Sequence, residues 1–133
     1  MAKAGNIMLL RAGLWFVAAV TVVVGVVATF LPATFYRHIP WVALNPPYSE
    51  HLMRDYGAMN LGLALVLVVA AVTMNTLLVR TALCAYLLFA VPHLIFHATH
   101  LENFTTGAAA TELVALTIAA ILPAFLLALT RSH

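Results

Sequence analysis

AGLWFVAAVTVVVGVVATFL, residues 12–31, decides the fold of this chain. Two threonines are its only polar residues, and none of its residues is charged. A helix needs roughly 20 apolar residues, at about 1.5 Å each, to cross a bilayer. The many valines would also suit a buried strand, but the run is too long for one. We therefore predict a membrane-crossing helix, ended by Pro32 because proline disfavours the helical conformation of the residue before it.

The rest of the chain has the same character. Of its 133 residues, 65% are hydrophobic and 8% are charged, whereas soluble proteins carry about 25% charged residues. Further long apolar stretches occupy residues 52–74, 77–100 and 108–130. We predict a single all-α domain over residues 1–133: an integral membrane four-helix bundle, up-down-up-down. The lipid bilayer is its expected environment, and nucleic acid is excluded as a partner because the formal charge is only +2, with no basic cluster.

The connections contain local signals for where the helices begin and end. Residues 32–49 form an aromatic and proline-rich connection suited to the headgroup layer, with one short helical turn expected near residues 34–38. Ser49 is placed to cap the second span, Asn75 to make the next turn, and Thr105 or Thr106 to cap the last span. Pro92 is expected to bend the third span.

Smaller residues inside the spans have simpler expected roles. Gly57 and Gly62 should allow close helix approach, and Trp15 and Phe16 should face lipid or pack between helices. The lone cysteine, Cys84, is expected to be a buried small residue.

The distribution of arginine and lysine predicts the orientation. With four spans, both termini and the Asn75 turn share one side of the membrane, and the 32–49 connection lies on the other. The first side carries Lys3, Arg11, Arg80 and Arg131, and the second carries Arg37 and Arg54. The positive-inside rule then places both termini in the cytoplasm. The predicted location is the cell (inner) membrane, with multiple passes.

Three of the six histidines lie near the end of the third span. His93, His97 and His100 are spaced i, i+4 and i+7, so they share one helix face. The topology brings other polar residues to the same, outer end of the bundle, with Asn60 somewhat deeper. The predicted site or polar network consists of His51, Arg54, Asp55, Asn60, His93, His97, His100 and Glu112. Ionisable residues inside a membrane usually mark a functional site.

Three interpretations of this cluster remain open. In the first it is a polar network or ligand pocket, with Arg54 paired to Asp55 or Glu112. In the second it holds a divalent metal through His93, His97, Asp55 and Glu112. Leu94 stands where a zinc protease needs glutamate, and the Glu-x-x-His pairs of di-iron bundles are missing. In the third, haem is held by two histidines such as His51 and His97.

Two stretches resemble a known family. One is Arg11-Ala12-Gly13-Leu14, followed by a span that ends at Leu31-Pro32. The other is Arg54-Asp55-Tyr56-Gly57-Ala58-Met59-Asn60-Leu61-Gly62-Leu63-Ala64. In these stretches and in its layout the chain resembles the DoxX-like small four-helix bacterial membrane proteins. The resemblance implies an inner-membrane bundle, tied in some relatives to respiratory or oxidative-stress complexes, and it supplies no catalytic residues.

The leading functional hypothesis is a non-enzymatic membrane protein. It would be an accessory subunit, or it would bind a small apolar ligand through the histidine and carboxylate cluster. A membrane-complex partner or a second copy of the chain is a further expected partner. The alternative is a metal- or haem-dependent redox enzyme that uses the same residues. A third hypothesis, a small transporter, needs a carboxylate near the middle of a span, whereas Asp55 and Glu112 lie near one surface.

Overall fold

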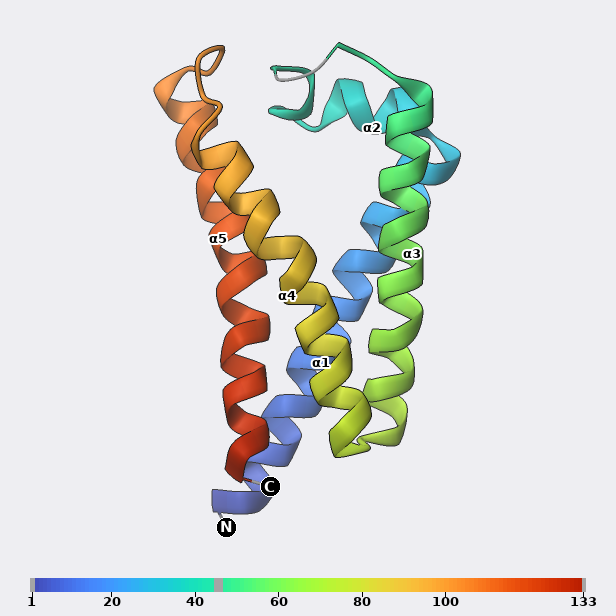
Figure 1. The fold of residues 1–133 in the computed structure, drawn as a ribbon, viewed down its shortest axis with the longest axis vertical. Coiled ribbons are helices and arrows are strands. Elements are labelled where there is room, and N and C mark those ends of the chain that lie inside the picture. Colours follow the sequence, from blue (N-terminus) through green and yellow to red (C-terminus); the bar gives the residue numbers. More distant parts are fainter. Residues whose placement is uncertain (1, 45–46, 133) are drawn as a thin grey trace.

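A computed structural model describes residues 2–44 and 47–132, and all regular structure in these residues is helical (Figure 1). The α-helices are α1 (Ala2–Phe30), α2 (Pro32–His38), α3 (Glu50–Thr73), α4 (Thr76–Ala98) and α5 (Thr106–Leu129). Short 3₁₀ turns occupy Val42–Leu44 and Thr130–Ser132. The all-α prediction is confirmed for the described residues.

Four of these helices are long and apolar enough to cross a membrane: α1 (from Gly5), α3, α4 and α5. In their most apolar windows only 22% to 33% of the residues are buried inside the molecule. Large apolar side chains therefore cover the outside, including Trp15 and Phe16, which are 44% and 58% exposed. Apolar surface this extensive is typical of a chain surrounded by lipid. The arrangement is that of a small multi-pass membrane protein.

The helix ends follow local chemistry. Ser49, Asn75 and Thr105 cap α3, α4 and α5, because each side-chain oxygen accepts a hydrogen bond from a backbone N–H in the first turn, at 3.1 to 3.3 Å. Pro32 begins α2, where its missing N–H is no loss. The first helix extends further than the predicted span, since α1 begins at Ala2. No proline interrupts residues 2–11, so the helix continues through them.

The four long helices form two pairs. Helix α1 packs along α3, and α4 packs along α5. The two pairs approach each other at the end where α1 begins and α5 ends, and they diverge toward the end that carries α2 (Figure 1). The main core lies in the half away from α2, and its fully inaccessible side chains include Leu14, Leu67, Leu83 and Leu126. A smaller apolar cluster, with Ala28, Phe35 and Met53 at its centre, lies under α2.

Glycine allows the closest contact between α1 and α3. A Cβ atom on Gly57 would overlap the backbone nitrogen of Thr29 and lie 2.8 Å from the carbonyl carbon of Ala28. The predicted role of Gly57 is therefore confirmed, whereas Gly62 has nothing within 4 Å of its Cβ position and the prediction for it is wrong. Gly62 lies on an exposed face of α3. Cys84 is also exposed, contrary to prediction, because its face of α4 points away from the core.

In each pair, one arginine connects the two helices. Arg54 on α3 donates to the carbonyl oxygen of Thr29 at the end of α1, at 2.5 Å. Arg80 on α4 donates to the carbonyl and hydroxyl oxygens of Thr130 just after α5, at 2.8 and 3.0 Å. Carbonyl groups at a helix C-terminus have no partner within the helix and favour a nearby positive charge. Each guanidinium therefore satisfies the end of the neighbouring helix.

Candidate functional site

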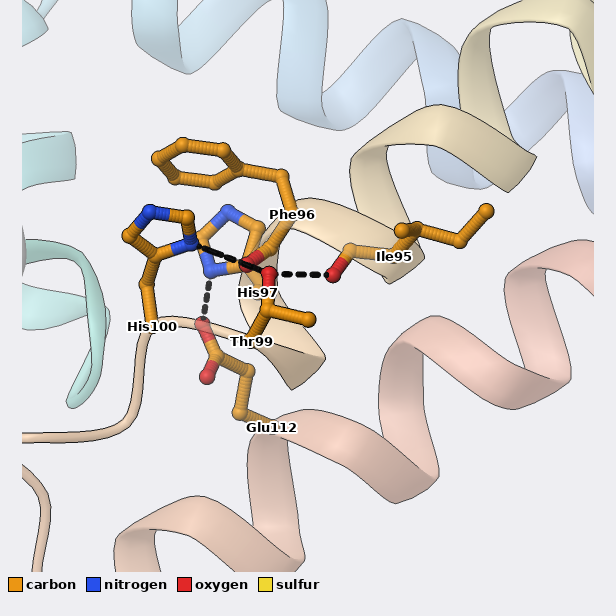
Figure 2. Close-up of polar contacts among 6 residues, drawn as sticks. All are labelled: Ile95, Phe96, His97, Thr99, His100 and Glu112. Carbon is orange, nitrogen blue, oxygen red and sulfur yellow. Dashed lines mark hydrogen bonds and ion pairs between the residues drawn. The ribbon is translucent and has the colours of Figure 1, made fainter.

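The most buried ionisable group described is Glu112, in the second turn of α5. Its side chain is wholly inaccessible, and its Oε1 lies 2.5 Å from Nδ1 of His97 on α4 (Figure 2). The His97 side chain is 15% exposed. The pair therefore joins α4 to α5 within the half of the bundle where the helix pairs diverge, and only its histidine touches the outside.

Glu112 is poorly satisfied for a buried carboxyl group. The contact with His97 is close in distance, yet neither carboxyl oxygen makes a hydrogen bond of ordinary geometry with a described residue. Buried polar atoms almost always have such a partner, so each exception needs an explanation. A buried carboxylate with one close histidine and a free oxygen is suited to accept a hydrogen bond from a further group.

His93 connects the pair to a series of aromatic rings. Its ring centroid lies 4.5 Å from that of His97, 5.0 Å from that of Phe89 and 6.0 Å from that of Tyr56 on α3. Phe89 and Tyr56 are themselves 6.0 Å apart. These distances are typical of interacting rings. The rings bridge the diverging helix pairs, because Tyr56 belongs to one pair and the other three belong to the other.

An open groove of about 520 Å³ runs between α3 and α4 beside these rings. All but one of its lining residues are apolar, and the exception is His93. The lining residues are Met59, Leu63, Ala85, Leu88, Phe89, Pro92 and His93. Leu88 is 78% exposed, so the groove opens on the outer, apolar surface of the bundle. The groove therefore offers an open apolar surface with a single hydrogen-bonding side chain, that of His93.

Three of the other predicted residues lie near the start of α3 and pair within that helix. On α3, His51 pairs with Asp55 at 3.1 Å, and both side chains are exposed. Arg54 pairs with Glu50 at 2.8 Å. The predicted pairing of Arg54 with Asp55 or Glu112 is therefore wrong, because Glu50 lies one turn away on the same helix face.

Two further predicted residues make hydrogen-bonding contacts with residues a few positions earlier in the chain. Asn60 donates to the carbonyl oxygen of Tyr56 at 2.8 Å. His100 lies at the end of α4, with Nδ1 2.8 Å from the carbonyl oxygen of Phe96 and 3.1 Å from the hydroxyl of Thr99 (Figure 2). The predicted cluster is thus not one network. Of its residues, only His93, His97 and Glu112 form a contiguous group of three, in which Glu112 is buried and the two histidines are partly buried.

The predicted metal ligands do not come together. Across residues 2–44 and 47–132, no three His, Cys, Asp or Glu side chains are arranged to hold a metal ion. Asp55 is engaged with His51 at the exposed start of α3, apart from the His97–Glu112 pair. The structure also does not favour a haem held by His51 and His97. The His51 side chain is 88% exposed and that of His97 only 15%, so the two histidines lie in different surroundings.

Sequence reasoning did not identify Tyr56 and Phe89 as parts of the site. Phe89 could have been found, because it precedes His93 by four residues and so shares the helix face of His93 and His97. Tyr56 gave no such signal, since its contact depends on how α3 and α4 pack.

Comparison of the chain with protein-family models, with curated proteins and with solved structures finds no match.

Proposed function

We propose that this membrane protein binds a small lipid-soluble molecule between α3 and α4. The observation that carries the proposal is the continuity of two features: the apolar groove contains His93, and His93 contacts His97 of the buried His97–Glu112 pair. An apolar body would occupy the groove, and a polar end would point toward His93 and the pair. A role as an accessory subunit, which the DoxX-like resemblance would imply, is compatible with such a site.

The shape of the groove supports entry from the bilayer. Its rim includes Leu88 and Met59, which are 78% and 41% exposed on the apolar surface. A ligand dissolved in lipid would reach the groove by lateral diffusion, without crossing the packed core in the other half of the bundle. Its apolar atoms would leave one apolar environment for another, so the polar contacts would provide most of the selectivity.

The proposed topology is up-down-up-down in the inner membrane, with both termini in the cytoplasm and α2 on the outer side. The excess of Arg and Lys around the termini and the Asn75 turn supports this orientation. Single cysteines placed at Tyr48 and at Asn75 in a Cys84→Ala background test it. In intact cells a membrane-impermeant maleimide should label only the cysteine at position 48, and labelling only at position 75 would reverse the orientation.

The ligand proposal is tested by what purifies with the protein. The untagged chain is isolated in mild detergent, extracted with organic solvent and analysed by mass spectrometry. Ala85→Phe places a ring in the groove, and Leu65→Phe is the matched control on an exposed face of α3 outside the groove. A lipophilic compound should accompany the wild type and Leu65→Phe in stoichiometric amount and be lost from Ala85→Phe. Equal extracts from all three proteins would contradict the proposal.

A further inference from the structure

We infer that the ligand of this groove is an uncharged lipid-soluble alcohol, whose hydroxyl group bonds to the imidazole of His93 and to the backbone carbonyl of Leu88. The inference rests on the proposed function, because it names the chemical class of the molecule that the α3–α4 groove would take. Three features support it: the hydrogen-bonding atoms that the groove offers, their position along it and the apolar character of the rest of its lining.

His93 presents the hydrogen-bonding side chain of the groove. It makes ring contacts with Tyr56, Phe89 and His97, and no described residue forms a hydrogen bond with its ring nitrogens. A neutral imidazole carries one N–H donor and one acceptor nitrogen. The groove therefore contains a donor and an acceptor that the described part of the chain leaves available to a ligand.

Pro92 adds a backbone acceptor at the same place. In an α-helix the N–H of residue 92 would bond to the carbonyl oxygen of residue 88, and proline has no N–H. The carbonyl of Leu88 therefore lacks its usual partner, and no described side chain donates to it. Leu88, Pro92 and His93 all line the groove. A carbonyl without a donor is costly in apolar surroundings, so this position favours a ligand that donates a hydrogen bond.

A hydroxyl group matches both positions. It has one donor and two acceptor lone pairs, so it can donate to the carbonyl of Leu88 while it accepts from the N–H of His93. The oxygen of an ether or a ketone can only accept, and it would leave the Leu88 carbonyl without a donor. An alcohol is therefore favoured over these other uncharged oxygen compounds.

The two polar groups lie toward one end of the groove. His93 is five residues before the last residue of α4, and Ala85 lies eight residues, or about 12 Å, deeper along the helix. The lining residues of α3, Met59 and Leu63, are near the middle of their helix. An amphiphile would thus place its hydroxyl group toward the membrane surface and its apolar chain toward the middle of the bilayer.

The lining offers no countercharge to an ionised ligand. Apart from His93, no ionisable side chain of the described residues lines the groove. Glu112 is wholly inaccessible, Arg54 donates to the carbonyl of Thr29, and Arg80 lies 13 residues before His93, about 20 Å along α4. An unpaired charge in apolar surroundings is far more costly than an uncharged polar group. Amines, carboxylates and phosphates are therefore disfavoured.

The test varies the polar end while keeping the apolar body. Radiolabelled 1-decanol, methyl nonyl ether, decylamine and decanoate are titrated by equilibrium dialysis against the protein in zwitterionic nanodiscs, with empty nanodiscs measuring partition into lipid. The ether has the same carbon and oxygen atoms as decanol but cannot donate a hydrogen bond. Saturable binding of decanol should be about tenfold tighter than that of the ether, because the ether leaves a carbonyl unpaired. The two charged compounds should also bind more weakly than decanol.

Four variants locate the hydroxyl group. His93→Phe keeps an aromatic ring but removes its hydrogen bonds, so decanol should fall to the affinity of the ether. Pro92→Ala restores an N–H to the carbonyl of Leu88 and should remove part of the preference. His100→Phe and Pro123→Ala are the matched controls, because His100 lies outside the groove and Pro123 is a fully buried proline within α5. Both controls should keep the preference for decanol.

The outcomes separate the two proposals. If the ether, the amine or the carboxylate binds the wild type as tightly as decanol, or if a folded His93→Phe protein keeps the preference, the inference is wrong while the groove remains a binding site. If none of the four compounds binds above the empty nanodiscs, or if Ala85→Phe binds decanol as the wild type does, the proposed function fails with it. A preference in Pro92→Ala equal to that in Pro123→Ala overturns the bond to Leu88, and this comparison decides alone should His93→Phe not fold.

Discussion

Two histidine–carboxylate pairs lie toward the same end of this bundle, and they differ in almost everything except their chemistry. His51 and Asp55 are one turn apart on α3, 3.1 Å from each other, with side chains 88% and 62% exposed. His97 and Glu112 join two helices at 2.5 Å, with side chains 15% and 0% exposed. The comparison shows how burial, rather than residue type, decides what such a pair does.

Solvent accounts for the difference. An exposed ion pair gains little, because water and salt screen the charges and ordering two side chains costs entropy. A buried carboxylate has lost its hydration, so its close partner becomes essential to the folded state. His51–Asp55 is therefore a feature of the surface, whereas His97–Glu112 should control both the stability of the α4–α5 pair and any ligand bound beside it.

The largest expected effect comes from removing one partner of the buried pair. His97→Leu leaves Glu112 buried without its close histidine contact, which should lower the free energy of unfolding by about 3–5 kcal/mol. Unfolding by sodium dodecyl sulfate in mixed micelles, followed by circular dichroism, measures the change. His100→Leu is the matched control, because its side chain is exposed and its contacts are local. An equal effect of the two substitutions would refute the distinction between the pairs.

The second prediction concerns the stability of a variant in which both His97 and Glu112 are replaced. Replacing a buried ion pair by apolar residues is often neutral, since no uncompensated charge remains. His97→Leu with Glu112→Leu should therefore be more stable than His97→Leu alone, with a coupling energy of about 1–3 kcal/mol in a double-mutant cycle. The same unfolding assay on the two single variants and the double variant gives this value. Strict additivity would mean that His97 and Glu112 do not stabilise each other.

The smallest effect is expected at the exposed pair. Asp55→Ala should change the free energy of unfolding by no more than about 0.5 kcal/mol, and raising the salt concentration should remove most of that change. The effect of His97→Leu should persist at the same salt concentration because the pair is shielded from solvent. A large, salt-independent effect of Asp55→Ala would place Asp55 in a buried network after all.

The features that sequence predicted well are those set by nearby residues. Ser49, Asn75 and Thr105 cap their helices because a cap depends on a side chain and the next three residues. The apolar runs give the four helices because length and hydropathy decide what can cross lipid. The shared face of His93 and His97 also follows from helix periodicity, and their rings do touch.

The features that it missed depend on how the helices rotate and pack. Gly57 and Gly62 look alike in sequence, yet only Gly57 meets another helix. Cys84 was expected inside and lies outside, since an apolar residue gives no sign of which face it occupies in lipid. Arg54 had several carboxylates within possible reach, and it paired with the one on its own helix face. Tyr56 belongs to the site only because its ring on α3 lies against those of Phe89 and His93 on α4, a contact between helices that the sequence does not reveal.

The divergence of the two helix pairs toward α2 has a consequence for the surrounding lipid. The helices are closest where the fully buried leucines pack, and farthest apart at the other end (Figure 1). In a bilayer such a tapered body displaces more acyl chain from one leaflet than from the other. The leaflet around the wide end would then hold less lipid in the area that the protein spans, and the groove residues Phe89, Pro92 and His93 lie in the half of α4 nearer that end.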